Sequence, residues 1–319
     1  MIGYLVRRIF AVIPVLLLVA VAVFSLLQLT PGDPAQLIAG DTATPEQIQA
    51  IREKLHLDQP PLVQAMAWGS ALAHGDLGTS LLSGVPVTTL IAQRIEPTLM
   101  LALLTIILAV CVGVPLGTFA ATRVGSLIDR LVMLLSVMAF SVPVFILAYG
   151  LVYFISLKLH WLPAQGYKPL SAGLGATLNS LMLPAVALCG VYMAQIARVT
   201  RAAVIEVLTE DFIRTARAKG LSRLYVLIVH ALPNAAIPIV TIIGFGVGGL
   251  LGGVVVTETV FNIPGLGQLA ASAILQRDYP IIQALTLLFA VVYVLVNLLV
   301  DLSYGLFDPR VRVWKAVNR

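Results

Sequence analysis

Charged residues are scarce in this chain, and their scarcity excludes an ordinary soluble domain. Only 11% of its 319 residues are Asp, Glu, Lys or Arg, whereas 59% are hydrophobic. A soluble domain carries roughly 25% charged and about 45–50% apolar residues. A helix buried in a soluble core would account for one long uncharged stretch, but this chain has several. The composition therefore predicts an integral membrane protein.

Several stretches hold no charged residue at all, and each approaches the roughly 20 apolar residues that a helix needs to cross a bilayer. Uninterrupted apolar runs do not fit the alternating pattern of a membrane β-barrel. We therefore expect an all-α integral membrane protein with six transmembrane helices, at residues 9–29, 97–122, 131–157, 181–197, 235–257 and 281–300.

The first of these stretches follows Arg7 and Arg8, as the apolar part of a secretory signal peptide would. It continues to Leu29, however, and is longer than the apolar part of a typical signal peptide. We therefore expect a retained helix.

Cysteine is also scarce, and the usual cofactor motifs are missing. Cys111 and Cys189 both fall within expected spans, where a thiol usually serves as a small packing residue. No zinc-type ligand spacing occurs, and no G-x-x-x-x-G-K-[ST] phosphate loop occurs. We expect no disulfide, no metal site and no cofactor bound by this chain, and we expect it not to be an enzyme.

The expected spans lack the ionisable residues on which ion-coupled carriers depend. A secondary carrier is therefore disfavoured, and the absence of an H-E-x-x-H helix disfavours an intramembrane protease. A transporter of this composition would take its energy from a partner. A structural or assembly subunit of a membrane complex is the other alternative.

Lys and Arg gather on one side of the expected spans, which predicts the orientation of the chain. If the N-terminus is cytoplasmic, residues 30–96 form an outer cap, residues 97–305 a membrane core and residues 306–319 a cytoplasmic tail. The inside segments then hold most of the basic residues: Arg7, Arg8, Arg123, Arg130, Arg198, Arg201, Arg214, Arg217, Lys219, Arg223, Arg310, Arg312, Lys315 and Arg319. This asymmetry fits contact with anionic lipid headgroups and not with nucleic acid, because no basic patch alternates with aromatic residues.

The outer cap has the sequence features of a small folded unit. Thr44 followed by Pro45 predicts a helix start, and Ile48, Ile51 and Leu55 would form its apolar stripe. A second helix is expected over 62–73.

The fifth apolar stretch is rich in glycine at helical spacing. Gly244, Gly246 and Gly249 match a G-x-G-x-x-G pattern, but no strand precedes them, so a dinucleotide site is not expected. Small residues four positions apart instead let another helix approach closely. We expect tight packing, within the chain or against a second subunit, at Gly244, Gly248, Gly249, Gly252 and Gly253.

Three further residues are candidates for a role in transport. Pro143, with Ser141 just before it, is expected to kink the third span and is a candidate pore residue. Glu258 follows the fifth span and is a candidate outer gate or contact for a partner; the alternative is a solvated charge at the end of a helix.

The polar segment 206–233 is unusual in so apolar a chain. Residues 206–220 are expected to form one helix, with a Glu210–Arg214 pair and with Gly220 ending it in the left-handed conformation. Leu208, Phe212 and Ala216, with Ile213 beside them, would form its apolar side. Such a helix would insert into the groove of a partner or lie on lipid headgroups.

This segment resembles the EAA loop of bacterial ABC importer permeases, which reads Glu-Ala-Ala, three residues, Gly, nine residues, Ile-x-Leu-Pro. Here Gly220 is followed by nine residues and by His230-Ala231-Leu232-Pro233, so His230 replaces the Ile. Arg214, Thr215 and Ala216 stand at the Glu-Ala-Ala positions, where two of the three differ. Asp211–Gly220 is similar to the variant of the peptide/opine/nickel subgroup.

The likeness to the dipeptide-permease-B type of this subgroup extends over nearly the whole chain. It includes the stretches Tyr4–Arg8, Thr30–Pro34, Gly75–Gly78, Thr257–Phe261, Pro264–Gly267, Arg277–Pro280 and Asp308–Arg310.

The resemblance implies a type I ABC importer permease fold in the bacterial inner membrane, with a cytoplasmic coupling helix. It implies a second, homologous permease subunit, two cytoplasmic ATPase subunits that bind ATP and Mg²⁺, and a periplasmic or lipid-anchored solute-binding protein. The solute would be a di- or oligopeptide, with nickel chelate, glutathione or opine as alternatives. The ATPase-coupling residues would be Glu210, Asp211, Arg214, Thr215, Ala216, Arg217, Lys219, Gly220, His230 and Pro233.

Overall fold

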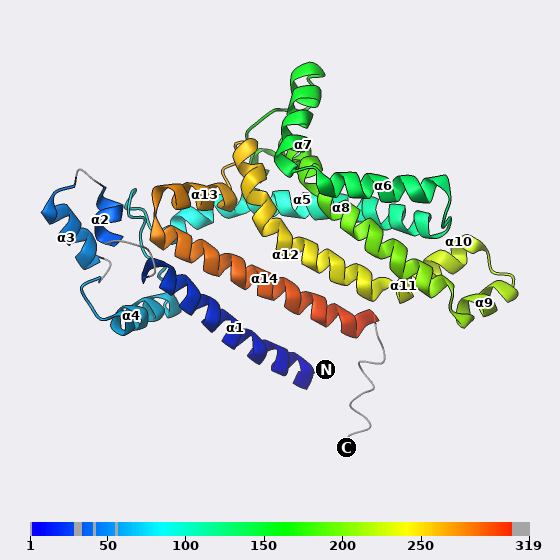
Figure 1. Ribbon diagram of the computed structural model, residues 1–319, viewed down its shortest axis with the longest axis horizontal. Helices are drawn as coiled ribbons and strands as arrows, with labels where there is room; N and C mark the ends of the chain where they lie inside the picture. Colours follow the sequence, from blue (N-terminus) through cyan, green and yellow to red (C-terminus); the bar gives the residue numbers. More distant parts are fainter. Residues whose placement is uncertain (1, 29–33, 41–42, 55–56, 308–319) are drawn as a thin grey trace.

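The computed structural model describes residues 2–28, 34–40, 43–54 and 57–307, which fold into helices with no β-strand among them. The longer helices run roughly along the long axis of the molecule (Figure 1). In chain order the elements are α1 (Ile2–Gln28), α2 (Pro34–Ala39), α3 (Pro45–Lys54), α4 (Pro61–Ala73), α5 (Val87–Ala121), α6 (Leu127–Ser141), α7 (Val144–Leu151), η1 (Val152–Lys158), η2 (Leu170–Ala172), α8 (Leu174–Leu208), α9 (Asp211–Ala218), α10 (Arg223–Tyr225), η3 (Val226–Ala231), α11 (Leu232–Asn234), α12 (Ala236–Val260), α13 (Leu266–Gln276) and α14 (Tyr279–Phe307).

Four described helices, α5, α8, α12 and α14, are long and apolar enough to cross a membrane. The pair formed by α6 and α7–η1 would make a fifth span, and the apolar part of α1, Phe10–Ser25, is shorter. The described residues therefore provide four or five candidate spans, against the six expected. The helices α2–α4 lie at one end of the molecule and α9–α10 at the other (Figure 1).

The third expected span is broken rather than kinked. Helix α6 ends at Ser141, and α7 begins after Pro143 at an angle of 99° to α6. Val142 is extended (φ −85°, ψ 121°), because the ring of a following proline disfavours the helical conformation. A continuous helix over 131–157 was therefore wrong, and the segment α7–η1 projects away from the other long helices (Figure 1).

The helices extend beyond the uncharged stretches that predicted them. Helix α5 begins at Val87, and α8 covers Leu174–Leu208 although only 181–197 was expected. Uncharged runs mark only the part of a helix that lies at membrane depth, whereas the helix continues through polar residues on either side. The single helix expected over 206–220 was also wrong. Residues 206–208 are the last turn of α8, which continues through polar residues, and a separate helix, α9, follows.

The outer cap agrees with its sequence pattern. Helices α3 and α4 begin at Pro45 and Pro61, and the N–H of Gln47 donates to Thr44 Oγ1 while the N–H of Thr44 donates to Gln47 Oε1. This reciprocal pair is a capping box, which satisfies two backbone donors at the helix start. The stripe residue Leu55 lies outside the described residues.

Helix α8 is the central element of the core, and it contacts α5, α6, α7 and α12. Its closest neighbour is α5, whose glycines permit backbone contact. A Cβ at Gly113 would lie 2.9 Å from the Met193 carbonyl oxygen, and one at Gly117 would lie 2.3 Å from the Ala197 oxygen. These two glycines, four residues apart on α5, are a helix-packing motif that the sequence analysis overlooked.

The glycines of α12 pack on two sides of that helix, both within the chain. A Cβ at Gly244 or Gly248 would meet Val300 or Tyr293 of α14, and one at Gly253 would meet Leu188 of α8. Gly249 approaches Tyr192 of α8. No described atom lies within 4 Å of a Cβ at Gly252. The other four glycines are therefore occupied by helices of this chain. That a second subunit packs on α12 stays a prediction only for the side that carries Gly252.

We predict that Gly117→Ala destabilises the isolated chain. The added methyl group would lie 2.3 Å from a backbone oxygen, so α5 and α8 must separate. Such overpacking costs about 1–3 kcal/mol, against a gain in helix propensity of about 1 kcal/mol. The midpoint of thermal unfolding in detergent micelles should fall. Gly252→Ala is the matched control and should not lower the midpoint; equal midpoints for the two variants would contradict the packing argument.

Candidate functional site

We call the end of the molecule that the sequence predicts to be cytoplasmic the inner end, and the opposite end the outer end. The inner end carries the segment that the sequence singled out. Helix α8 ends at Leu208, and only Thr209 and Glu210 separate it from α9. The Thr209 hydroxyl donates to the Glu206 carbonyl oxygen at 2.7 Å, which closes the last turn of α8. Glu210 is extended (φ −68°, ψ 149°) and forms the N-cap position of α9. Because the connection is so short, the position of α9 follows that of α8.

Helix α9 packs its apolar side against its own chain. Ile213 is 0% exposed and Ala216 is buried, and both pack against Val226 and Ala231 of η3. Phe212 is 43% exposed and was wrongly assigned to this side. Leu208, which lies in α8, borders the same cluster.

The polar side of α9 differs in detail from the expected one. Arg214 Nη1 lies 3.1 Å from Asp211 Oδ1, in place of the expected pair with Glu210. Glu210 lies outside the helix, and its backbone oxygen accepts from the N–H of Ile213. Both members of the observed pair are exposed, and pairs of this kind add little stability. The Thr215 hydroxyl donates to the Asp211 carbonyl oxygen.

The end of α9 is built as a Schellman motif. Gly220 has φ +81°, the left-handed conformation that the sequence predicted. The N–H of Gly220 donates to the Arg217 oxygen and that of Leu221 to the Ala216 oxygen. These two bonds satisfy carbonyl groups that a helix end leaves free. Arg217 and Lys219 stay exposed at this end, where their charge complements the helix dipole.

The chain returns to the core through α10 and a π-helical turn. Ser222 caps α10, and η3 follows over Val226–Ala231. A π-turn of this kind widens a helix locally and often occurs at functional sites. His230 lies in it with its ring 5.8 Å from that of Tyr225, and its Nε2 has no hydrogen-bond partner among the described residues. Pro233 lies in the first turn of α11.

Exposed apolar side chains surround this segment. Together we call these six exposed side chains the inner apolar patch: Phe212, Leu221, Leu224, Tyr225, Ile228 and Val229.

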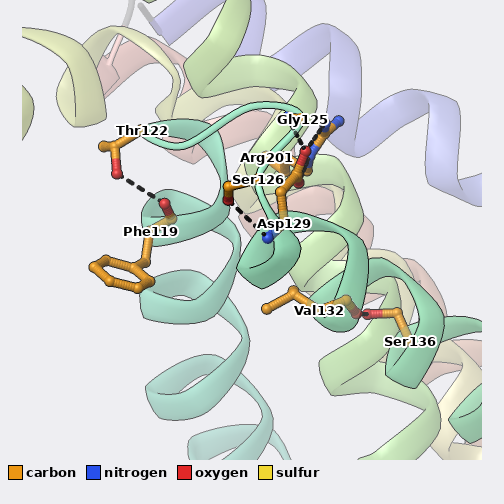
Figure 2. A network of polar contacts seen from close by, with 8 residues as sticks. All are labelled: Phe119, Thr122, Gly125, Ser126, Asp129, Val132, Ser136 and Arg201. Carbon is orange, nitrogen blue, oxygen red and sulfur yellow. Dashed lines mark hydrogen bonds and ion pairs between the residues drawn. The ribbon is translucent and has the colours of Figure 1, made fainter.

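A second inner element is the turn between α5 and α6 (Figure 2). Asp129 in the first turn of α6 accepts two hydrogen bonds from the Arg201 guanidinium of α8, from Nε to Oδ1 at 2.5 Å and from Nη2 to Oδ2 at 2.7 Å. The N–H of Gly125 also donates to Asp129 Oδ2, and the N–H of Asp129 donates to Ser126 Oγ. The carboxylate therefore joins the turn, α6 and α8.

At the outer end, Glu258 is neither solvated nor free. It is 0% exposed, Thr98 Oγ1 of α5 donates to its Oε1 at 2.6 Å, and the N–H of Gln268 donates to its Oε2. The N–H of Leu266 donates to Thr98 Oγ1. Because carboxylates are favoured at a helix N-terminus, Glu258 and Thr98 together cap α13. The alternative of a solvated end charge was wrong.

Two glycines make room for this carboxylate. A Cβ at Gly265 would lie 2.1 Å from Glu258 Oε1, and one at Gly267 would lie 2.7 Å from Val255 Cα. The Pro264–Gly267 stretch noted in the sequence thus lets α13 approach α12 closely.

Two more acidic residues hold the outer loops in the same way. Ser80 Oγ donates to Asp278 Oδ2 at 2.5 Å and joins the loop before α5 to the turn between α13 and α14. Tyr167 Oη donates to Glu96 Oε1 at 2.6 Å, and the N–H of Leu170 donates to the same oxygen. Burial of Tyr167, followed by its bond to the Glu96 carboxylate, raises the pKa of Tyr167 well above its usual value.

These polar contacts are not evident from the sequence alone. The sequence shows only that charged residues stand next to the uncharged stretches, among them Asp129, Arg201, Glu96 and Asp278. Which acid meets which base depends on how the helices pack. Ser141 Oγ donates within its own helix, to the Val137 oxygen.

We predict that Gly220→Ala weakens the end of α9. No described atom lies within 4 Å of the new methyl group, so the effect comes from the backbone, which costs about 1–2 kcal/mol for a non-glycine residue in the left-handed conformation. Gly220→Asn should cost less, because asparagine tolerates this conformation. Hydrogen exchange of the Leu221 amide should rise more in the Ala variant; the reverse order would contradict the Schellman assignment.

We predict that Glu258→Ala loosens α13. The variant leaves the N–H of Gln268 without its acceptor, at a cost of about 1–3 kcal/mol for a buried group, and leaves the Thr98 hydroxyl only the longer 3.4 Å bond to the Arg94 oxygen. Hydrogen exchange of the Gln268 amide should accelerate at least 10-fold. Thr259→Ala is the control, because the Thr259 hydroxyl bonds only the Val255 oxygen of its own helix. Equal exchange rates of the Gln268 amide in the two variants would show that Glu258 does not cap α13.

Known proteins resemble this chain along almost its full length. Residues 113–313 match the family described as binding-protein-dependent transport system inner membrane component, and residues 1–102 match the N-terminal family of the same membrane components. A probable peptide ABC transporter permease, y4tP of Sinorhizobium fredii, is 49% identical over 309 residues, which cover 97% of this chain and 99% of that protein. The glutathione transport system permease GsiC of Salmonella typhimurium is 43% identical and covers 98% and 99%.

The fold has a counterpart among solved structures. An inward-facing structure of the MetNI methionine ABC transporter aligns with a TM-score of 0.58 and 20% identity, over 69% of this chain and 97% of that chain. At this identity the likeness shows the fold, which is that of a type I ABC importer permease. The chain is an integral membrane protein and belongs to the family of binding-protein-dependent transport system inner membrane components.

Proposed function

We propose that this chain forms half of the translocation pathway of an ATP-driven importer of di- or oligopeptides. A homologous permease subunit forms the other half, and two cytoplasmic ATPase subunits supply the energy from ATP and Mg²⁺. A periplasmic or lipid-anchored binding protein delivers the solute to the outer side, where the cap 30–96 receives it. The chain lies in the bacterial inner membrane with both termini in the cytoplasm.

The observation that carries this proposal is the packing of α9. Its apolar residues Ile213 and Ala216 face the chain itself, so its charged residues point outward on a braced helix. A helix that lies on lipid headgroups would instead turn its apolar side toward the membrane. An internally packed helix with an exposed charged side can instead offer that side to a protein partner of complementary charge.

The coupling step follows from the connection between α9 and α8. Closure of the ATP-loaded ATPase pair moves α9, and α8 moves with it because only Thr209 and Glu210 separate them. Motion of α8, the central helix, opens one side of the pathway and closes the other as a rigid-body change. ATP drives this change only through the difference in its affinity for the two states.

The choice of a peptide solute rests on the relatives. Several are named as peptide permeases, and others as permeases for glutathione, itself a tripeptide. Glutathione is accordingly the second candidate, and nickel chelates and opines come after it. No group of three or more metal-ligating side chains occurs among the described residues.

Reconstituted transport tests this function. The chain and its partner subunits are placed in liposomes with ATP, and the uptake of radiolabelled trialanine and of glutathione is measured. We expect uptake of at least one of the two that requires ATP hydrolysis. Uptake that persists with hydrolysis-deficient ATPases would support a secondary carrier, and absence of both would refute the peptide assignment.

Docking is tested by the double variant Arg214→Glu/Arg217→Glu. Reversing two exposed charges on α9 should weaken binding of the ATPases at least 10-fold, which corresponds to about 1.4 kcal/mol. Lys158→Glu is the control, because Lys158 is an exposed cation far along the chain in η1. The ATPases are copurified with each variant and quantified. Equal recovery from the double variant and the control would move the docking site away from α9.

A further inference from the structure

The Asp129–Arg201 pair joins two inner elements that are 72 positions apart in the sequence. Asp129 has 5% of its side chain exposed, so its charge depends on the arginine for compensation. The guanidinium meets both carboxylate oxygens, and this bidentate geometry fixes orientation as well as distance. The pair thus fixes the start of α6 against α8 in one arrangement (Figure 2).

Neighbouring contacts make the inner end stiff on either side of this pair. Gly125 has φ +77°, and its N–H binds Asp129, so the tight turn between α5 and α6 is held by the same carboxylate. On the other side, α8 continues from Arg201 to Leu208 without interruption. The backbone contact at Gly117 fixes α5 against α8 just before the turn.

Other basic residues nearby make different contacts. Arg123 lies 4.7 Å from the centre of the Phe119 ring, and Arg198 lies 6.0 Å from that of Phe140. Arg198 is exposed and stands one turn before Arg201 on α8. It therefore offers a control with the same charge, on the same helix, outside the pair.

We propose that Asp129 and Arg201 are positioning residues that make the α5–α6 turn move together with α9. This inference rests on the proposed function, in which α9 receives motion from an ATPase. With the pair intact, displacement of α9 carries α8, α6 and the end of α5 as one body. Without the charge pair, α5 still moves with α8 through the contact at Gly117, but the turn and the start of α6 lag, and ATP hydrolysis is less tightly converted into opening of the pathway.

The first test measures whether the two elements form one body. Spin labels are attached at Val124→Cys in the turn and at Lys219→Cys after α9, in a chain whose native thiols are removed by Cys111→Ser and Cys189→Ala. Distances are recorded by pulsed electron resonance in nanodiscs. We expect a narrow distribution, and we expect Asp129→Asn to at least double its width. Asparagine still accepts from the Gly125 N–H, so the turn itself is retained.

Three further variants keep this test decisive. Arg201→Lys retains the charge but loses the bidentate contact, and it should broaden the distribution to an intermediate width. Arg198→Gln should leave it unchanged. In the double variant Asp129→Asn/Arg201→Met the width should not exceed that of the single variants, because the two residues act through one contact. An unchanged width in both Asp129→Asn and Arg201→Lys overturns the proposal.

The second test measures the ratio of trialanine transported to ATP hydrolysed in the complete transporter. We expect the ratio to fall at least 5-fold in Asp129→Asn, with ATPase recovery equal to that of the unaltered chain. A residue with only a structural role would reduce recovery and leave this ratio unchanged. An unchanged ratio together with a broadened distance distribution overturns the transmission role. Failure of the proposed function is distinguishable, because the unaltered transporter would then show no ATP-driven uptake.

Discussion

Backbone contact between α5 and α8 is the constraint on which the rest of the structure depends. Gly113 and Gly117 let these helices approach to a distance that no side chain would permit. Lipid tails are as apolar as the helices, so close packing supplies attraction that the hydrophobic effect cannot. Because the two helices cannot separate, each end of α5 meets a defined part of the chain: Thr98 reaches Glu258 at the outer end, and the turn after Ala121 reaches Arg201 at the inner end.

Hydrogen bonds to buried carboxylates position the loops at the two ends of the packed helices. Buried backbone and charged groups must find partners within the protein, because burial removes them from water. Glu258 caps α13, Asp278 holds the loop before α5, and Asp129 holds the turn after it. These carboxylates thus determine how the loops lie on the helices. From the sequence alone, charges at the ends of spans would be expected to be exposed to solvent.

The proposed docking of an ATPase depends on the contrast between the braced helix α9 and the exposed side chains beside it. Ile213 packs α9 against η3 of the same chain, while Arg214 and Arg217 remain exposed. The connection between α8 and α9 is only Thr209 and Glu210, so in the proposed function α8 is the path by which force applied at α9 would reach the membrane core. The inner apolar patch lies around this segment, where a protein partner would cover it.

The sequence by itself determined that the chain is an all-α integral membrane protein, and it determined the family. It also determined the cap helices at Pro45 and Pro61 and the left-handed end of α9 at Gly220. The length of an uncharged stretch, the spacing of a motif and the conformation of a glycine are all local properties of the chain. It did not determine that the third span breaks by 99° at Pro143, since a proline within an apolar run is compatible with both a kink and a break. Nor did it predict the burial of Glu258 or its partner Thr98, which stands 160 positions away. Only the tertiary structure decided these points, because the energy of a buried charge depends on groups that packing alone brings within hydrogen-bond distance.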